Sequence, residues 1–218
     1  MTLRDTLAGM KAGFLTKIPP AALAVMERAT ADLQATGQAG RAIGVGDRAP
    51  DFTLDDQDGT PVALADLLSR GPVVLTFYRG VWCPYCNAEL NALQDALPAI
   101  EAAGASLLAI SPQTAVNSRR AQRENGLGFP VLADAGNAVA AAFGLAFDLP
   151  TDLRGVYDSF GINLPTFNGE DAWALPIPAR YVIAPDGTVL WAAVDPDYTT
   201  RPDPAEMLPA LEAARRAA

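Results

Sequence analysis

The chain has 218 residues, half of them apolar, which suffices for one well-filled core and favours a single domain with extensions. Its net charge of -9 disfavours nucleic acid and anionic lipid as partners, because the average field repels both. It contains no histidine, which excludes an imidazole base, a Cys-His dyad and a histidine-ligated metal. We see neither a signal-peptide pattern nor an apolar run near the roughly 20 residues that span a bilayer, so we expect a cytoplasmic protein without a membrane partner.

Residues 1–42 are predicted to form an N-terminal helical arm. The pattern consists of two segments that are broken at Ile18-Pro19-Pro20, because proline disrupts a helix interior. In the second segment Leu23, Met26 and Leu33 recur at helical spacing. We interpret the arm as a packing element or a dimer contact rather than as part of a catalytic site.

Residues 43–218 are predicted to form one α/β domain, because short apolar runs alternate with helical patterns. The run Val73 to Phe77 is continuously apolar, as in a strand that is covered on both faces. The other predicted elements are strands at 106–110 and 131–132, hairpins at 52–64 and 180–194, and helices at 84–103, 117–125 and 138–143.

The segment 147–175 is predicted to be an insertion. It is rich in proline, asparagine and glycine and is too long for an ordinary connection. We expect one helix within it, at 152–160. Long ordered insertions often border functional sites, but a surface elaboration without chemistry fits the pattern equally well.

Both cysteines of the chain lie in the stretch FYRGVWCPYCNAEL, with two residues between them. Pro84 suits the first position of a helix, which places Cys83 at the helix N-terminus and Cys86 in the first turn. Backbone N–H groups and the helix dipole favour a thiolate there. The spacing allows a small-ring disulfide, and Trp82 and Tyr85 are expected to shield the pair from water.

Three other interpretations of the two cysteines compete with a redox pair. Buried structural cysteines are common, but this spacing after a buried strand disfavours them. A zinc site needs about four nitrogen or sulfur ligands, which a chain with two cysteines and no histidine does not supply without carboxylates. An inert structural disulfide is disfavoured in the cytoplasm. We therefore expect a reversible redox pair that needs no metal or organic cofactor.

These residues resemble the thioredoxin-fold superfamily and, within it, the peroxiredoxin-like proteins of the alkyl hydroperoxide reductase and thiol-specific antioxidant group. The resemblance covers Val45 to about Val194 and rests on VGDRAPDFTL, VVLTFY, RGVWCPYC and LPIPARYVIAPDGTVL. It implies a thioredoxin-like fold with a central mixed sheet flanked by helices. It also implies that Pro178 is the superfamily's cis-proline facing the redox cysteines.

The chain departs from the peroxiredoxin pattern P-x-x-x-[TS]-x-x-C, in which the last cysteine attacks peroxide. In that register Arg79 takes the place of the proline, Cys83 that of the hydroxyl residue and Cys86 that of the peroxidatic cysteine. The family's distant arginine is replaced by Pro178, although Arg180 is close by. Arg79 and Arg180 are the candidate cations for a thiolate, because a guanidinium is always charged. The stretch Asp195 to Arg201 also resembles this group, without an assigned role.

The resemblance implies a thiol peroxidase that reduces hydrogen peroxide or organic hydroperoxides through a Cys83–Cys86 disulfide, with a thioredoxin-like or other dithiol protein as reductant. The alternatives are a protein disulfide reductase and a redox-responsive binding module. The position at the helix N-terminus favours Cys83 as the attacking thiol. The peroxiredoxin register favours Cys86 for the peroxide step, so this question stays open at the level of sequence.

Overall fold

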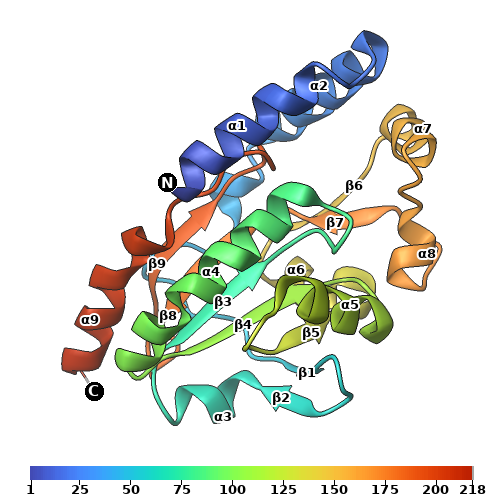
Figure 1. Ribbon diagram of the computed structural model, residues 1–218. Helices are drawn as coiled ribbons and strands as arrows, with labels where there is room; N and C mark the ends of the chain where they lie inside the picture. Colours follow the sequence, from blue (N-terminus) through green and yellow to red (C-terminus); the bar gives the residue numbers. More distant parts are fainter. Residues whose placement is uncertain (218) are drawn as a thin grey trace.

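The computed structural model describes residues 1–217 and is built around a five-stranded mixed sheet (Figure 1). The strand order is β5-β4-β3-β8-β9; β3, β4 and β5 are parallel, whereas β8 is antiparallel to both of its neighbours. This arrangement confirms the predicted thioredoxin-like sheet. The strands are β3 (Val73–Phe77), β4 (Ser106–Ser111), β5 (Val131–Ala133), β8 (Ala179–Ile183) and β9 (Val189–Val194).

Two apolar layers cover the sheet. Alternate side chains of a strand point to opposite faces, so Val74 packs in one layer and Leu75 in the other. The first layer contains side chains of α1 (Leu3–Leu15), α4 (Pro84–Ala102) and α9 (Leu208–Ala217). The second contains side chains of α3 (Leu64–Leu68) and α6 (Ala138–Ala142). All five residues of β3 are buried, as its continuous apolar run predicts.

The predicted hairpin near the start of the domain is confirmed. Strands β1 (Thr53–Asp55) and β2 (Pro61–Ala63) are antiparallel, and Gly59 in the turn between them has a φ of +83° that glycine adopts without strain. The helix α5 (Ala115–Asn125) also lies where the polar helical pattern predicted it. Short 3-10 helices complete the chain: η1 (Ala39–Arg41), η2 (Ala135–Asn137) and η3 (Pro204–Met207).

The segment 147–175 begins and ends in a small antiparallel ribbon of β6 (Ala146–Asp148) and β7 (Ala174–Pro176). Between these strands lie α7 (Thr151–Ser159), which matches the predicted helix, and α8 (Leu164–Asn168), which was not predicted. Side chains of both helices, together with Leu149 and Leu175, form a third apolar cluster, against which Val25, Met26 and Ala29 of the N-terminal arm pack.

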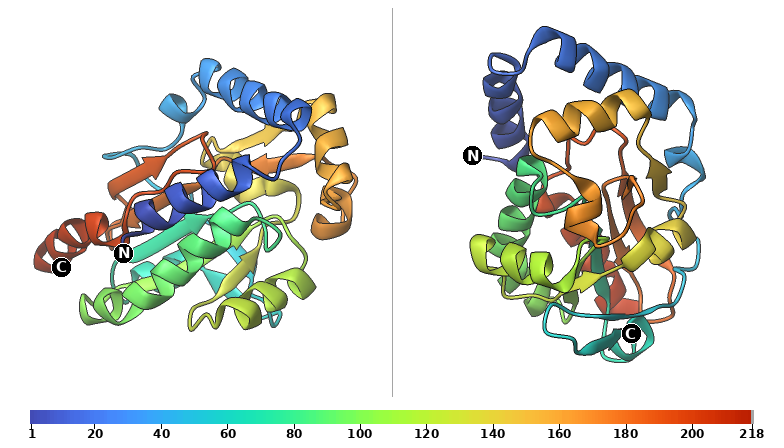
Figure 2. Two further views of the ribbon diagram at one scale, coloured as in Figure 1. Left: turned by 45° about the horizontal axis from the view of Figure 1, so that its top comes forward. Right: turned by 90° about the vertical axis from the view of Figure 1, so that its right-hand side faces the viewer.

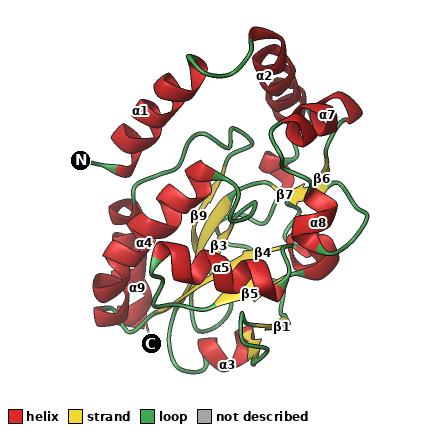
Figure 3. Cartoon of the chain, turned by 45° about the vertical axis from the view of Figure 1, so that its right-hand side comes forward, coloured by secondary structure: helices red, strands yellow, loops and turns green. Residues whose placement is uncertain are grey.

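The N-terminal arm consists of α1 and α2 (Pro20–Ala35), with the predicted break before Pro20. Helix α1 lies against α4, and α2 continues across the molecule to lie beside α7 (Figures 2 and 3). The ion pair between Arg28 and Asp152 joins α2 to α7. The arm therefore bridges the sheet domain and the inserted helices. None of the described helices is both long and apolar enough to cross a lipid bilayer.

Candidate active site

Cys83 and Cys86 lie where β3 leads into α4. Cys83 is the N-cap of α4 in an extended conformation, Pro84 is the first helical residue, and the Cys83 N–H donates to the Gly80 carbonyl at 3.0 Å. Cys86 follows in the first turn. Both thiols are free, and the two residues are 1% and 0% exposed, respectively. The local geometry is the one that the position of Pro84 predicted.

Gly80 and the hydrogen bonds of two side-chain amides fix the conformation of the loop before Cys83. Gly80 has a φ of +146°, and a Cβ there would lie 2.4 Å from Nε1 of Trp82. The Val81 N–H donates to Oε1 of Gln113 at 2.9 Å, and Nε2 of Gln113 donates to the Tyr78 hydroxyl at 2.6 Å. Nδ2 of Asn87 donates to the Val81 carbonyl at 2.8 Å. These contacts fix the direction from which Cys83 enters the helix.

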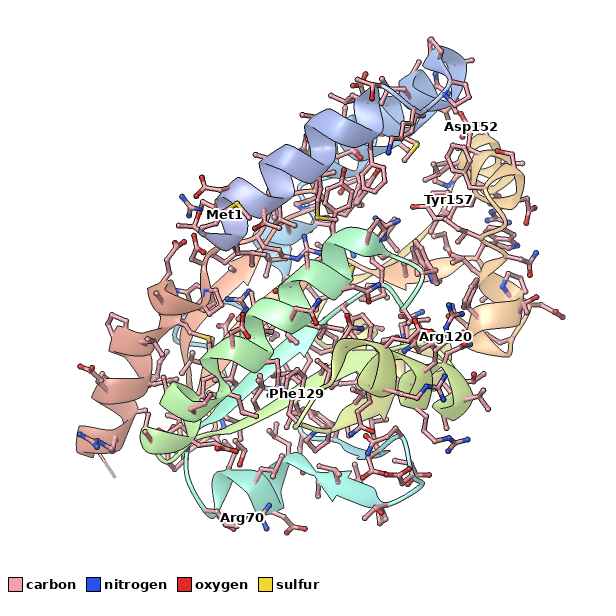
Figure 4. The ribbon with its side chains drawn as sticks, in the orientation of Figure 1. Met1, Arg70, Arg120, Phe129, Asp152 and Tyr157 are labelled. Atoms are coloured by element: carbon pink, nitrogen blue, oxygen red, sulfur yellow. The ribbon has the colours of Figure 1, made fainter. Side chains whose placement is uncertain are left out.

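Arg79 is buried beside Cys83 in a cage of aromatic rings. Its guanidinium carbon lies 4.0 Å from the ring centre of Tyr198, 5.0 Å from that of Trp82 and 5.7 Å from that of Tyr157. It donates to the Tyr157 hydroxyl, whereas its Nε and Nη1 have no hydrogen-bond partner among the described residues. Figure 4 shows Tyr157 pointing from α7 into this region. No carboxylate is paired with Arg79 in the described chain, so its charge acts on the thiols.

The surroundings of Cys83 favour its thiolate. Burial opposes ionisation, but a hydrogen bond from Cys86 and the positive charges of Arg79 and Arg201 outweigh it and lower the pKa of Cys83 to about 6. Burial and the neighbouring Cys83 raise the pKa of Cys86 well above its ordinary value. Cys83 is therefore the more acidic thiol, and Cys86 holds its proton.

Cys86 lies beside a buried cluster of one carboxylate and two guanidinium groups. Oε1 of Glu89 accepts from Arg180 at 2.7 Å, and Oε2 accepts from Nε of Arg201 at 2.5 Å. Nη2 of Arg201 donates to Sγ of Cys86 at 3.7 Å. Burial opposes the ionisation of Glu89, but Arg201 and Arg180 outweigh it and lower the pKa of Glu89, so the cluster is charged.

The two predicted arginines lie in different surroundings. Arg79 lies beside Cys83, as its place in the loop suggested. Arg180 is buried on β8, and its described hydrogen bonds are to Glu89 and to the Pro202 carbonyl. The cation that contacts Cys86 is Arg201, which ends the stretch from Asp195 to which the sequence assigned no role.

Trp82 and Tyr85, which are expected from the sequence to shield the cysteines, line the same cavity as Cys83. The Trp82 ring packs edge-on against Tyr157 with 5.6 Å between ring centres, and Tyr85 packs against Phe14 and Tyr198 with 5.8 Å to each. Tyr157 comes from the inserted helix α7 and Phe14 from the arm. The insertion and the arm thus both border the site.

A cavity of about 260 Å³ reaches Cys83 but not Cys86. Its lining is apolar and aromatic, apart from Arg79 and the thiol. The sheet domain supplies Arg79, Trp82, Cys83, Pro84, Tyr85 and Tyr198, the insertion supplies Tyr157, Phe160 and Ile162, and the arm supplies Phe14, Ile18 and Met26. A second cavity of about 480 Å³ lies between α2 and α7 and shares Arg79 and Tyr157 with the first. A small reactant therefore has room beside Cys83.

The expectation that Pro178 follows a cis peptide bond is wrong, because no described peptide bond is cis. An X-Pro bond prefers trans by about 0.5–1 kcal/mol, and here the chain passes extended from β7 to β8. The Pro178 carbonyl accepts from the Asp195 N–H at 3.3 Å. Pro178 lines the larger cavity together with Arg79 and Tyr198, so it still borders the site.

Five of the site residues that were not predicted from the sequence contact the reactive groups or hold the cysteine loop through Val81. They are Gln113, which holds the loop, Glu89 and Arg201 beside Cys86, and Tyr157 and Tyr198 around Arg79. Glu89 could have been found from the sequence, because it follows Cys86 by three residues and so lies on the same face of the predicted helix. The other four reach the site through tertiary packing.

Comparisons with known proteins identify the family of the chain. The AhpC/TSA family profile matches residues 45–192. Peroxiredoxin Q from the chloroplast of Oryza sativa subsp. japonica is 33% identical over 132 residues, 59% of this chain and 60% of that protein. The thiol-disulfide oxidoreductase ResA of Geobacillus thermodenitrificans is 33% identical over 111 residues, 50% of this chain and 62% of that protein.

The crystal structure of peroxidoxin BcpB from Mycobacterium tuberculosis superposes with a TM-score of 0.60 and 29% sequence identity. The match covers 80% of this chain and 97% of that one. The chain thus spans about three fifths of the length of the plant and Geobacillus relatives, whereas it covers almost all of the mycobacterial structure. The region that matches the family profile, residues 45–192, contains the cysteine loop and Arg180 but not the arm or Arg201. On this evidence the chain belongs to the AhpC/TSA family.

Proposed function

We propose that this protein is a thiol-dependent peroxidase in which Cys83 attacks the peroxide and Cys86 resolves the product. One observation carries the proposal: the more acidic thiol lies at a helix N-terminus, beside the unpaired cation Arg79, at the end of an apolar cavity. A thiolate is the nucleophile that peroxide chemistry requires. Membership of the AhpC/TSA family supports the same reaction.

The cycle follows from the two thiols. The Cys83 thiolate attacks one oxygen of the hydroperoxide, the O–O bond breaks, and the other oxygen leaves as an alcohol or water after taking up a proton. The resulting sulfenic acid condenses with Cys86, which forms the S–S bond and releases water. An external dithiol protein of the thioredoxin type then returns two electrons and two protons. Hydrogen peroxide and organic hydroperoxides are both candidate substrates.

Arg79 has two roles in this proposal. Its charge stabilises the Cys83 thiolate, and its two unpartnered nitrogens, Nε and Nη1, lie buried beside the cavity. A guanidinium in such a position can donate to the oxygen that gains negative charge as the O–O bond breaks. The aromatic rings around Arg79 fix its orientation, because cations are attracted to ring faces.

A second candidate function is protein disulfide reduction. It is favoured by the presence of Cys83 at the position where the family pattern has a hydroxyl residue, because Cys83 and Cys86 then form a C-x-x-C pair. The match to a thiol-disulfide oxidoreductase supports this alternative. Both functions use the same disulfide, so they differ in the oxidant and not in the thiol pair.

A paired assay distinguishes the two functions. Peroxide-dependent consumption of reduced thioredoxin is expected for the peroxidase, whereas insulin reduction without peroxide consumption is expected for the reductase. The proposed disulfide is checked separately by intact mass, which should fall by the mass of two hydrogens after mild oxidation. A stable sulfenic or sulfinic acid in the wild-type protein, without a disulfide, would contradict the cycle.

The cellular location and the oligomeric state also belong to the proposal. We propose a cytoplasmic protein, because a reversible dithiol pair suits a reducing compartment. We retain a homodimer through the arm as a hypothesis to be tested by sedimentation, although the described arm packs against α4 and α7 of its own chain.

A further inference from the structure

Reduction of the proposed disulfide by a protein poses a problem of access. Thiol–disulfide exchange needs direct contact between the incoming sulfur and the sulfur that it attacks. Cys83 is 1% exposed and Cys86 is 0% exposed, so the surface of a folded protein does not reach either sulfur in this conformation. A small hydroperoxide needs only the cavity of about 260 Å³ beside Cys83.

The N-terminal arm contributes to the cover over Cys83. Phe14, at the end of α1, packs on Tyr85, and Ile18 and Met26 line the same cavity. All three side chains are apolar, and all three lie outside the region that matches the family profile. The cover is therefore an addition to the family domain and not part of its sheet or helices.

The two ends of the arm are held unequally. The start of α1 is anchored, since Leu3 and Leu7 are buried in the core and the Leu3 N–H donates to Asp203 at 2.6 Å. Helix α2 has no buried residue. The ion pair that joins it to α7, between Arg28 and Asp152, is about half exposed on both sides. The apolar side chains by which α2 packs on the inserted helices, Val25, Met26 and Ala29, are only partly buried. Exposed ion pairs contribute little stability, so displacing α2 should cost less free energy than displacing the anchored start of α1.

We propose that residues 14–35 form a lid over Cys83, and that the surface beneath it docks the reducing protein. The docking surface consists of Trp82, Pro84 and Tyr85 around the Cys83 sulfur. The partner must present apolar side chains around its own reactive cysteine, because it takes the place of Phe14, Ile18 and Met26. The lid thus separates oxidation by peroxide from reduction by the dithiol protein. Peroxide enters beneath the closed lid, whereas the dithiol protein binds only when the lid is displaced.

The exchange step rests on the disulfide of the proposed function. With the lid displaced, the partner's thiolate attacks Sγ of Cys83, the intermolecular S–S bond forms, and Cys86 leaves as a thiolate that takes up a proton. The partner's second cysteine thiolate then attacks the sulfur of the partner's first cysteine, which is bonded to Cys83. This step forms the partner's disulfide and releases Cys83 as a thiolate. The partner is oxidised by two electrons, and the protein is reduced by two.

The test compares a large and a small thiol probe on the Cys86→Ser protein, in which Cys83 is the remaining cysteine. The large probe is a thioredoxin with one reactive cysteine, activated as its thionitrobenzoate disulfide, so that coupling to Cys83 is driven chemically. The small probe is methyl methanethiosulfonate. Arg28→Asp breaks the ion pair by repulsion with Asp152, and Arg28→Asp combined with Asp152→Arg restores it with the charges exchanged. Both sites are exposed, and neither lines the cavity at Cys83.

The lid predicts that Arg28→Asp speeds coupling to the thioredoxin probe by roughly 2- to 5-fold, the range for an exposed ion pair. Coupling to the small probe should stay unchanged, and the charge-exchanged double variant should return the thioredoxin rate to its starting value. An unchanged thioredoxin rate in Arg28→Asp, or an equal acceleration of both probes, would overturn the lid.

Hydrogen exchange provides a second measurement that does not depend on the ion pair. The amides of α2 should exchange faster in the mixed disulfide with thioredoxin than in the protein blocked by the small probe, whereas those of α4 should not. Equal protection of α2 in both adducts would overturn the lid. Neither measurement uses peroxide, so a failure of the peroxidase proposal would appear in the peroxide assay and not here.

Discussion

Cys83 and Cys86 belong to one helix turn, yet their surroundings differ in charge and in access. Cys83 faces a cavity and a guanidinium that has no carboxylate partner in the described chain. Cys86 faces a guanidinium that is already paired with Glu89, and the cavity does not reach it. The difference is the basis of the roles that we propose for two identical side chains: the unpaired charge and the adjacent cavity both favour Cys83 as the attacking thiol.

The largest expected effect comes from removing the carboxylate on the Cys86 side. Glu89→Gln leaves Arg180 and Arg201 buried without a counter-charge, which should lower the free energy of unfolding by about 3–5 kcal/mol. The freed charge of Arg201 should also make Cys86 more acidic. Urea denaturation measures the first effect.

Glu101→Gln is the matched control, because Glu101 is exposed on the same helix and its loss should change stability little. Equal stability of the Glu89 and Glu101 variants would show that the buried cluster does not define the surroundings of Cys86.

The pH dependence of thiol reactivity tests the charge on the Cys83 side. Because the pKa of Cys83 is lowered to about 6, its alkylation rate should level off above that pH and fall roughly tenfold per unit below it. Because the pKa of Cys83 is lower in the folded than in the unfolded protein, ionisation of this thiol stabilises the fold, fully so above the ordinary thiol pKa. This stabilisation is lost as the pH falls through about 6, the pKa of Cys83 in the folded protein. The free energy of unfolding should therefore rise between pH 6 and 8, less so in Cys83→Ser. A rate that still increases above pH 8 would contradict the assignment.

Arg79→Ala should produce a smaller change in the same measurement. Loss of the guanidinium should raise the pKa of Cys83 by about one unit, which slows alkylation roughly tenfold at pH 5 but only about twofold at pH 7, where most of the wild-type thiol is already ionised. Arg79→Lys keeps a charge and should recover part of the rate, although its ammonium lacks the planar contact with the rings. If Arg79→Ala leaves the alkylation profile unchanged, the charge next to Cys83 is not what makes this thiol acidic.

The part of the site that could be predicted from the sequence is the part encoded by neighbouring residues. The apolar run of β3 and the position of Pro84 sufficed to place Cys83 at a helix N-terminus, because both signals are local. The position of Arg79 near Cys83 could be predicted for the same reason, because both residues lie in one short loop. The short elements α3, α8, β6 and β7 carry too few residues for a periodic pattern and were not predicted, nor was the C-terminal helix α9.

The long-range contacts could not be predicted from local patterns. Arg201 lies 115 positions from Cys86 and reaches it because the chain turns back after β9. The pleat of β8 places Arg180 on the same face as Val182, toward α4, where it meets Glu89 and not a cysteine. The docking of the arm over Cys83 likewise depends on tertiary packing, and its apolar spacing alone fits any packed helix.

Single-turnover kinetics with the two serine variants tests the central claim most directly. If Cys83 attacks the peroxide, Cys86→Ser should retain a fast reaction with one equivalent of hydroperoxide and end in a sulfenic acid on Cys83 that dimedone traps. Cys83→Ser should lose the fast step, because burial still opposes ionisation of the remaining thiol and the cavity does not reach it. A fast peroxide reaction in Cys83→Ser, with the sulfenic acid on Cys86, would contradict the account and assign the peroxidatic role to Cys86.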